Sequence, residues 1–234
     1  MVRLIVPTGY SVLDARIRGI SLPSLISVPF DPGSLHRVFL HRLLHSFIRT
    51  RGKKIVYLAV DAPPLAIIEE LKDIGFDINA LINDKKWVFE DLFEVVSGKK
   101  QGIGRNLLAY DLRNIFRFYV YPHLEEGSCI MIDSLTYFLL GTPHKGLMKL
   151  LFSLKAKLYE SESLCILSYL RNAIPRETAG IINHMSDGVL ELQVIEDRPI
   201  LYIPKLRGQL EGLPLLAPYE ITSVGIRIST ARRA

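Results

Sequence analysis

Short apolar runs with a high β-propensity recur along this chain, and segments with helical periodicity separate them. Strands that alternate with helices are typical of βαβ units and of a mostly parallel sheet. Both faces of such a sheet are buried, which fits the mean hydropathy of +0.23. The pattern therefore predicts an α/β fold. The expected strands are Leu25 to Val28, Lys54 to Val60, Ser128 to Asp133, Leu164 to Tyr169 and Gly188 to Val194.

Helices are expected between these strands, and a different pattern follows the fifth strand. The apolar periodicity and the Gly and Pro positions place the helices at Gly33 to Thr50, Pro64 to Ile74, about Arg105 to Tyr121 and about Lys145 to Tyr159. Short strands separated by Gly and Pro then follow at Pro199 to Leu206, Tyr219 to Thr222 and Gly225 to Ser229. We expect one domain over residues 1–234, with a core of about 20–195 and an antiparallel β extension of about 196–230.

Composition narrows the classes of protein to which the chain can belong. No apolar run approaches the roughly 18 residues of a membrane helix, and the start of the chain lacks the features of a secretory signal, so we expect a cytoplasmic protein without membrane contact. The net charge of +5 allows an acidic partner such as nucleic acid. Cys129 and Cys165 lack metal-ligand spacing, so buried reduced thiols and no metal site are expected.

The segment Leu25–His36, LISVPFDPGSLH, has the strand, loop and helix context of a phosphate-binding loop. If Gly33 is taken as the second glycine of GxxxxGK[ST], Val28 stands at the first glycine, Ser34 at the lysine and Leu35 at the hydroxyl residue. Such a loop lacks the ammonium that reaches the phosphates and the oxygen that binds magnesium. The sequence therefore predicts a degenerate nucleotide site at Gly33, Ser34 and Leu35, with ATP and magnesium disfavoured and no bound cofactor.

Other segments carry a pattern found in one group of ATPases. An apolar strand ends in Asp133 and Ser134, as a Walker B element does, and these two residues join the candidate nucleotide site. Near the end of the chain come SDGVLEL at 186–192, KLRG at 205–208 and PYEIT at 218–222. These segments resemble the "YxADGVIEL", "KxRG" and "PFEIT..GI" motifs of the RecA superfamily, in its KaiC-like and RadA-like branch. Thr8-Gly9 with Leu13-Asp14 is similar to the opening "TGI..LD" of that branch.

The resemblance implies a RecA-like core and assigns roles to individual residues. Asp61 matches the first of two acidic positions that polarise water, and Ala62 replaces the second. Asp61 and Asp133 are thus the vestigial catalytic candidates. Lys205 and Arg207 match the pair that, in ring-forming relatives, reaches a neighbour's γ-phosphate as an arginine finger does. The alternatives stay open: Asp133 as a strand-end carboxylate, and Lys205 and Arg207 as solvated charges on a turn.

Three histidines and several Lys and Arg residues are further candidates for binding roles. His41 and His45 are expected on an exposed helix face, and His36 at the helix start can contact an anion. The DNA-contacting loops of RadA-like recombinases match about 137–146 and 171–184 here. The candidate DNA contacts are Arg171, Arg176, Lys99, Lys100 and Arg105.

The functional hypothesis is a non-catalytic RecA-superfamily homologue that works as an interaction or regulatory subunit. Its expected partner is a paralogue or a second copy of the chain, and it completes a partner's ATPase site in trans or serves recombination. A weakly ATP-binding or ATP-hydrolysing enzyme and a stand-alone DNA-binding protein remain the alternatives.

Overall fold

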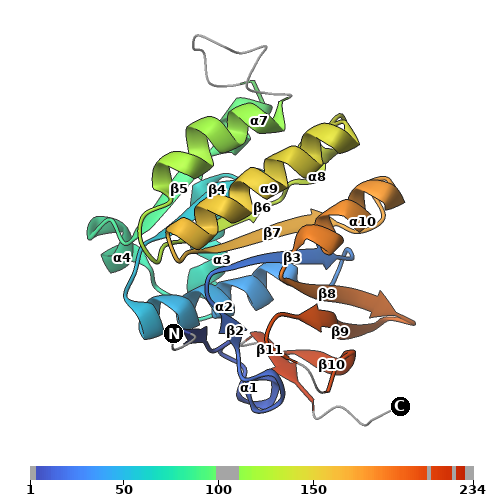
Figure 1. Ribbon diagram of the computed structural model, residues 1–234. Coiled ribbons are helices and arrows are strands. Elements are labelled where there is room, and N and C mark those ends of the chain that lie inside the picture. The colour runs from blue at the N-terminus through green and yellow to red at the C-terminus, as the bar shows by residue number, and fades with distance from the viewer. Residues whose placement is uncertain (1–3, 99–110, 210–211, 223–224, 230–234) are drawn as a thin grey trace.

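The fold is built on one large sheet with helices on both faces (Figure 1). The computed structural model describes residues 4–98, 111–209, 212–222 and 225–229. Within them, nine strands lie in the order β11-β10-β9-β8-β3-β7-β6-β4-β5. The predicted strands are present and parallel, which confirms the α/β fold. They are β3 (Ser24–Phe30), β4 (Ile55–Ala59), β6 (Cys129–Asp133), β7 (Leu164–Leu170) and β8 (Gly188–Ile195).

Antiparallel strands extend the sheet beyond β8, as predicted. They are β9 (Arg198–Leu206), β10 (Leu215–Thr222) and β11 (Gly225–Ile228). The parallel strand β5 (Trp87–Asp91) closes the other edge, and a separate two-stranded sheet pairs β1 (Ile5–Val6) with β2 (Ile20–Ser21). Strands β1, β2 and β5 were not predicted from the sequence.

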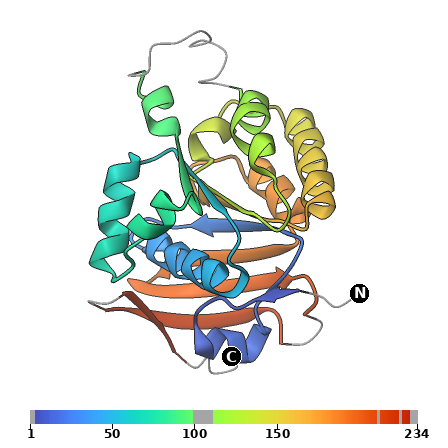
Figure 2. The same cartoon turned by 90° about the vertical axis from the view of Figure 1, so that its left-hand side faces the viewer.

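Successive side chains of a strand point to opposite faces of the sheet, and two layers of helices cover those faces. Ile55 and Tyr57 of β4 pack in the core layer with α1 (Ser11–Ile17), α2 (His36–Arg51) and α3 (Pro64–Asp73). Val56 and Leu58 pack on the other side with α7 (Leu112–Ile115), α8 (Thr136–Leu139), α9 (His144–Glu160) and α10 (Arg176–Met185). Figure 2 shows α2 and α9 on opposite sides of the sheet.

Several expected elements differ in their details. The helix predicted to end at Tyr121 consists of α7, a π-helical turn at Phe116–Val120 and a 3-10 turn at Tyr121–His123, and residues 105–110 lie outside the described residues. Two further short helices flank β5: α4 (Asn79–Asn83) and α5 (Leu92–Val96).

The two segments matched to DNA-contacting loops are largely helical. Most of 171–184 forms α10, which buries Thr178, Ile182 and Met185 against the core. The segment 137–146 holds the end of α8 and the start of α9. The resemblance matched 171–184 to a loop, whereas most of this segment is a helix anchored by buried residues spaced three or four apart.

A membrane-spanning helix needs both length and sustained apolarity. Of the helices that the described ranges contain, none combines the two to the degree that crossing a bilayer requires.

Candidate functional site

The candidate site lies at the carboxyl ends of the parallel strands, where α/β folds place their ligands. Three segments meet there: the loop 31–35 between β3 and α2, the end of β4, and the end of β6. Ala59 of β4 pairs with Asp133 of β6, and the backbone N–H groups of Val60 and Asp61 point to the Asp133 carbonyl oxygen at 2.9 and 3.3 Å. The fold therefore brings Asp61, Asp133 and the loop together, as the sequence predicted.

The Asp133 side chain is fully buried and is held by four other side chains. Oδ2 accepts hydrogen bonds from the Tyr57 hydroxyl at 2.7 Å and from Arg37 Nε at 2.7 Å. Oδ1 accepts from the Ser168 hydroxyl at 3.1 Å and lies 3.2 Å from His36 Nε2. A carboxylate has about four lone-pair sites, so these neighbours use its whole capacity.

The charge of Asp133 is balanced inside the protein. Burial by itself would raise the pKa of this carboxyl group, but the hydrogen bond and charge of His36, the charge of Arg37 and the Tyr57 hydroxyl together hold the pKa well below its ordinary value. Burial opposes the charge of Arg37, yet the neighbouring Asp133 raises the pKa of its guanidinium. The pair is therefore a buried carboxylate with an arginine as its counterion.

Arg37 contacts the carboxylate that would hold a magnesium ion if Asp133 served as a Walker B aspartate. In P-loop ATPases a Walker B aspartate and the loop Ser/Thr hold the same ion. Two residues at the start of α2 contact Asp133, His36 at 3.2 Å and Arg37 at 2.7 Å. Aligning Arg37, which makes the shorter contact, with the loop Ser/Thr places His36 at the lysine, Leu35 at the second glycine and Phe30 at the first.

This alignment lies two residues beyond the one predicted from the sequence, which stays a prediction. Val28 lies inside β3, paired with Ser168 of β7, so it does not open a loop. Leu35 has φ of 50° and ψ of 41°, the left-handed conformation that glycine favours, and α2 begins directly after it. Gly33 also has a positive φ, of 79°, so both positions have a backbone conformation that glycine favours.

Side chains of the loop region pack against one another rather than leaving it open. The Phe30 ring, 6% exposed, stacks on the His36 imidazole with 3.5 Å between centroids and 7° between planes. Ser34 is buried, and its carbonyl accepts a hydrogen bond of 2.6 Å from the Tyr219 hydroxyl. His36, a candidate for contact with a bound anion, contacts the Asp133 carboxylate and the Phe30 ring.

Asp61 and Ser134 form a second, smaller contact beside Asp133. The Ser134 hydroxyl donates to Asp61 Oδ2 at 2.7 Å and also lies 2.9 Å from the Thr136 hydroxyl. Burial raises the pKa of Asp61, while the Ser134 hydrogen bond opposes this effect. The catalytic role of Asp61 and Asp133 that the resemblance implies stays a prediction.

Lys205 and Arg207 lie near the amino ends of the parallel strands, at the other end from the candidate site. Leu206 pairs with Gly188, at the start of β8. The Arg207 guanidinium donates to the Pro23 carbonyl and to the Tyr159 hydroxyl, and Lys205 Nζ donates to the His184 carbonyl at 2.9 Å. Both side chains thus bond to their own chain, and their role in a neighbour's site stays a prediction.

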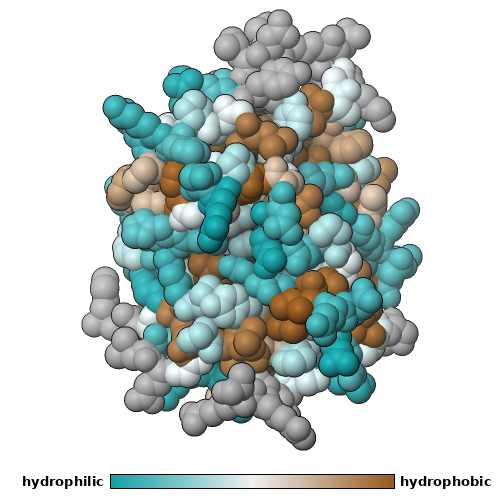
Figure 3. Space-filling model, turned by 90° about the vertical axis from the view of Figure 1, so that its right-hand side faces the viewer, coloured by the Kyte–Doolittle hydropathy of each residue, from teal (hydrophilic) through white to brown (hydrophobic). Residues whose placement is uncertain are grey.

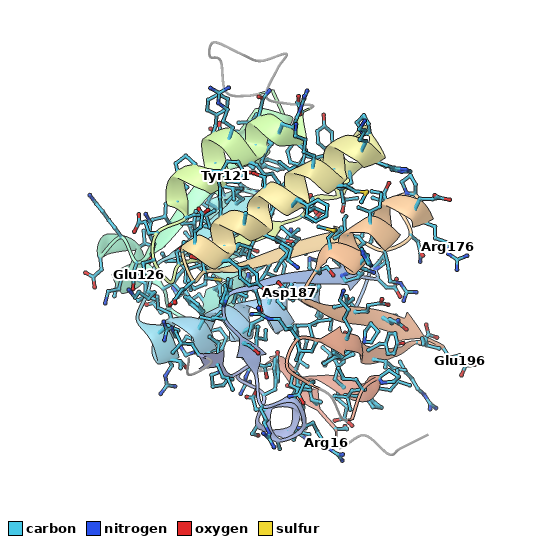
Figure 4. All side chains as sticks on the ribbon, viewed as in Figure 1. Arg16, Tyr121, Glu126, Arg176, Asp187 and Glu196 are labelled. Atoms are coloured by element: carbon cyan, nitrogen blue, oxygen red, sulfur yellow. The ribbon has the colours of Figure 1, made fainter. Side chains whose placement is uncertain are left out.

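The candidate DNA contacts do not form one surface in the described structure. Arg171 Nε lies 3.2 Å from Asp31 Oδ1, and its NH1 lies 3.5 Å from Glu191 Oε2, so its charge is neutralised internally. Arg176 is exposed at the start of α10 and points away from the molecule (Figure 4). Lys99, Lys100 and Arg105 lie outside the described residues.

A buried histidine continues the Asp133 network. His41, expected to face solvent, is 1% exposed, and its Nε2 lies 3.4 Å from the Tyr57 hydroxyl. The sequence interpretation of His41 was wrong because α2 packs this side chain against Tyr57 of β4. Burial lowers the pKa of His41 to about 3.

This histidine makes stability depend on pH. Below the ordinary pKa of 6.5, the unfolded chain binds a proton at His41 that the folded chain does not bind until about pH 3. Stability should therefore fall as pH falls from 6.5, by up to about 1.4 kcal/mol per pH unit. Urea unfolding between pH 6.5 and 4.5 should show a shallower slope for His41→Gln than for the wild type. The matched variant His184→Gln, at an exposed position, should keep the wild-type slope, and equal slopes in all three proteins would contradict the assignment.

Metal and thiol chemistry depend on which ligand groups and cysteine thiols the described structure holds. The parts of the chain that the structure describes hold no group of three or more His, Cys, Asp or Glu side chains that could bind a metal ion. Cys129 and Cys165 are buried free thiols, and burial raises the pKa of each.

Comparisons with known proteins agree with the fold. Among solved structures, the flagellar accessory protein FlaH from Methanocaldococcus jannaschii superposes with a TM-score of 0.78 at 16% identity, covering 97% of this chain and 100% of that one. The KaiC-like protein PH0186 from Pyrococcus horikoshii OT3 gives a TM-score of 0.75 at 18% identity, covering 97% and 100%. No curated protein matches. The family model "ATPase: KaiC" matches residues 6–233, and the chain therefore belongs to the KaiC family of ATPase domains.

Proposed function

We propose that this chain is a KaiC-family protein that does not turn over ATP and that acts as an interaction or regulatory subunit. The observation that carries the proposal is the Arg37–Asp133 pair at 2.7 Å. It puts a fixed positive charge on the carboxylate that magnesium would need. With arginine at the hydroxyl position, histidine at the lysine and leucine at the second glycine, the loop lacks each group on which phosphate and metal binding depend.

Binding magnesium at this site would require Arg37 to leave Asp133. The Asp133 side chain has no exposed surface, and that of Arg37 is 19% exposed. Breaking a buried ion pair of this kind costs several kcal/mol unless the new partner replaces the contacts. The side chains of Leu35 and Arg37 would also offer the ion no oxygen ligand. The arrangement therefore favours a nucleotide site closed by the protein's own side chains.

The partner that we propose is another KaiC-type subunit, either a relative or a second copy. Exposed apolar side chains support a role through contact. Met148, Phe152 and Tyr159 of α9 are 39%, 59% and 47% exposed. On the face in Figure 3, hydrophobic patches lie between hydrophilic side chains. The similarity to an archaeal flagellar accessory protein is compatible with a subunit of a larger assembly.

A recombination role would require a DNA contact in addition. Among the described candidates, Arg171 is neutralised by two carboxylates. Arg176 is exposed at the start of α10 and does not form a common surface with Arg171. These observations favour the subunit role over DNA binding.

The test of the proposal is ATP turnover by the purified protein, measured as phosphate release with magnesium and compared with Asp133→Asn. We expect a rate indistinguishable from buffer for both proteins. Addition of an active KaiC-type relative should then reveal a change in the relative's rate if the chain acts as its regulator. Turnover by the chain alone that is abolished in Asp133→Asn would overturn the proposal.

A further inference from the structure

A basic groove runs along the outer face of α2, away from the loop and Asp133. It is a hollow of about 490 Å³ between α2, Gly9 of the N-terminal segment and the turn at 74–76. Three cationic or titratable side chains and two hydroxyl groups from one helix line it: Arg42, His45, Arg49, Ser46 and Thr50. We propose that this groove binds a phosphate chain, as carried by a nucleoside triphosphate or by inorganic polyphosphate.

The spacing of the two arginines suits an extended anion. Arg42 and Arg49 are seven residues apart, which is two helical turns or about 10 Å along the axis. His45 and Ser46 lie between them on the same face. Guanidinium groups at the two ends and donors in the middle therefore follow the length of several linked phosphates. The volume of the groove is also within the range of small-molecule sites.

The positive charges of the groove have no counterion among the residues that the structure describes. Arg42 Nε donates to the Gly9 carbonyl at 2.9 Å, and its guanidinium lies 5.0 Å from the centre of the Tyr10 ring. These contacts orient Arg42 but leave its charge uncompensated. In the same described ranges, Arg49 forms no ion pair, and no carboxylate lines the hollow.

Packing contacts fix the shape of the groove. His45 stacks on Phe76 with 4.4 Å between ring centroids and 12° between planes, so its imidazole is held in one orientation. Burial, together with the charges of Arg49 and Arg42, lowers the pKa of His45. Gly9 has φ of 85°, and an added Cβ would lie 3.1 Å from the Arg42 carbonyl oxygen. A glycine is therefore needed for the N-terminal segment to lie this close to α2.

The experiment is a calorimetric titration of the whole protein with sodium tripolyphosphate in magnesium-free buffer, at low and at physiological salt. We expect saturable binding that weakens with salt. Arg49→Ala should weaken it about tenfold, as the loss of one charge-assisted contact would, and Arg49→Lys should keep part of the affinity. The matched control is Arg16→Ala, which removes the same charge from an exposed position on α1 (Figure 4).

A parallel titration with ATP distinguishes the two sources of the phosphate chain. Equal affinities assign recognition to the phosphates alone, and tighter binding of ATP that also depends on Arg49 assigns a nucleotide. Absence of binding, or a loss in Arg16→Ala as large as that in Arg49→Ala, would overturn the inference. Because Arg49 takes no part in the Asp133 network, either result leaves the proposed lack of ATP turnover untouched.

Discussion

Replacing Arg37 with alanine should lower the free energy of unfolding by about 3 kcal/mol, because it leaves a buried carboxylate without its counterion. Asp133 would keep the Tyr57 and Ser168 hydrogen bonds and the His36 contact, but no permanent positive charge. Its pKa should then rise, because the guanidinium charge no longer opposes the effect of burial, whereas the His36 and Tyr57 contacts still do. Urea unfolding at pH 7 measures the loss.

The structure provides a matched control on the same arginine. Arg37 NH1 also lies 3.1 Å from Glu70 Oε1, and the Glu70 side chain is 45% exposed. Glu70→Gln should cost less than about 1 kcal/mol, as exposed pairs do. Adding Asp133→Asn to Arg37→Ala should recover part of the stability, because no buried charge then remains. Equal costs for Arg37→Ala and Glu70→Gln would show that the buried pair does not hold the site.

Restoring the motif with Arg37 aligned to its Ser/Thr should create magnesium-dependent ATP binding. The variant carries Phe30→Gly, Leu35→Gly, His36→Lys and Arg37→Thr. It supplies the ammonium and the hydroxyl, frees Asp133 for the metal and removes the Phe30 ring from the loop. We expect a dissociation constant of about 0.1 mM or tighter, equivalent to about −5.5 kcal/mol, against no detectable binding at this loop in the parent chain. Arg49→Ala is included in both proteins to reduce binding at the α2 groove, and the comparison is made between these two proteins.

The alternative register supplies the control for this experiment. Val28→Gly, Ser34→Lys and Leu35→Thr write the same motif two residues earlier. This variant should not bind Mg-ATP, because Arg37 still covers Asp133 and Val28 belongs to β3. Binding by this variant and not by the first would show that the register inferred from Leu35 and Arg37 is wrong. Circular dichroism of both variants verifies that they are folded.

The sheet was predictable because its information is local. Each central strand is a short apolar run, and the helices that follow β3 and β6 carry apolar residues at helical spacing, so pattern alone located them. Strand β5, WVFED, is short and half polar, and α10 has only three buried anchors at Thr178, Ile182 and Met185. Their placement depends on packing against distant segments. The antiparallel extension was predicted from the Gly and Pro residues that separate its strands and from the motifs that resemble the RecA superfamily.

The centre of the site was only partly predictable. Asp133 and its proximity to Asp61 follow from strand order, which the sequence indicated. The role of Arg37 does not, since an arginine in the first turn of a helix is usually solvated and its partner is 96 residues away. The alignment predicted from the sequence takes Gly33, the only glycine in the loop, as the second glycine of the motif. The contact of Arg37 with Asp133 favours an alignment two residues later, which the sequence alone did not suggest.

We propose that Arg37 closes the nucleotide site from within. The most direct test of this closure is a crystal structure of the unmodified protein grown with excess ATP and magnesium. We predict Arg37 bonded to Asp133 and no triphosphate at the loop 31–35. An ordered triphosphate at this loop with magnesium on Asp133 and the Arg37 side chain displaced would contradict the claim.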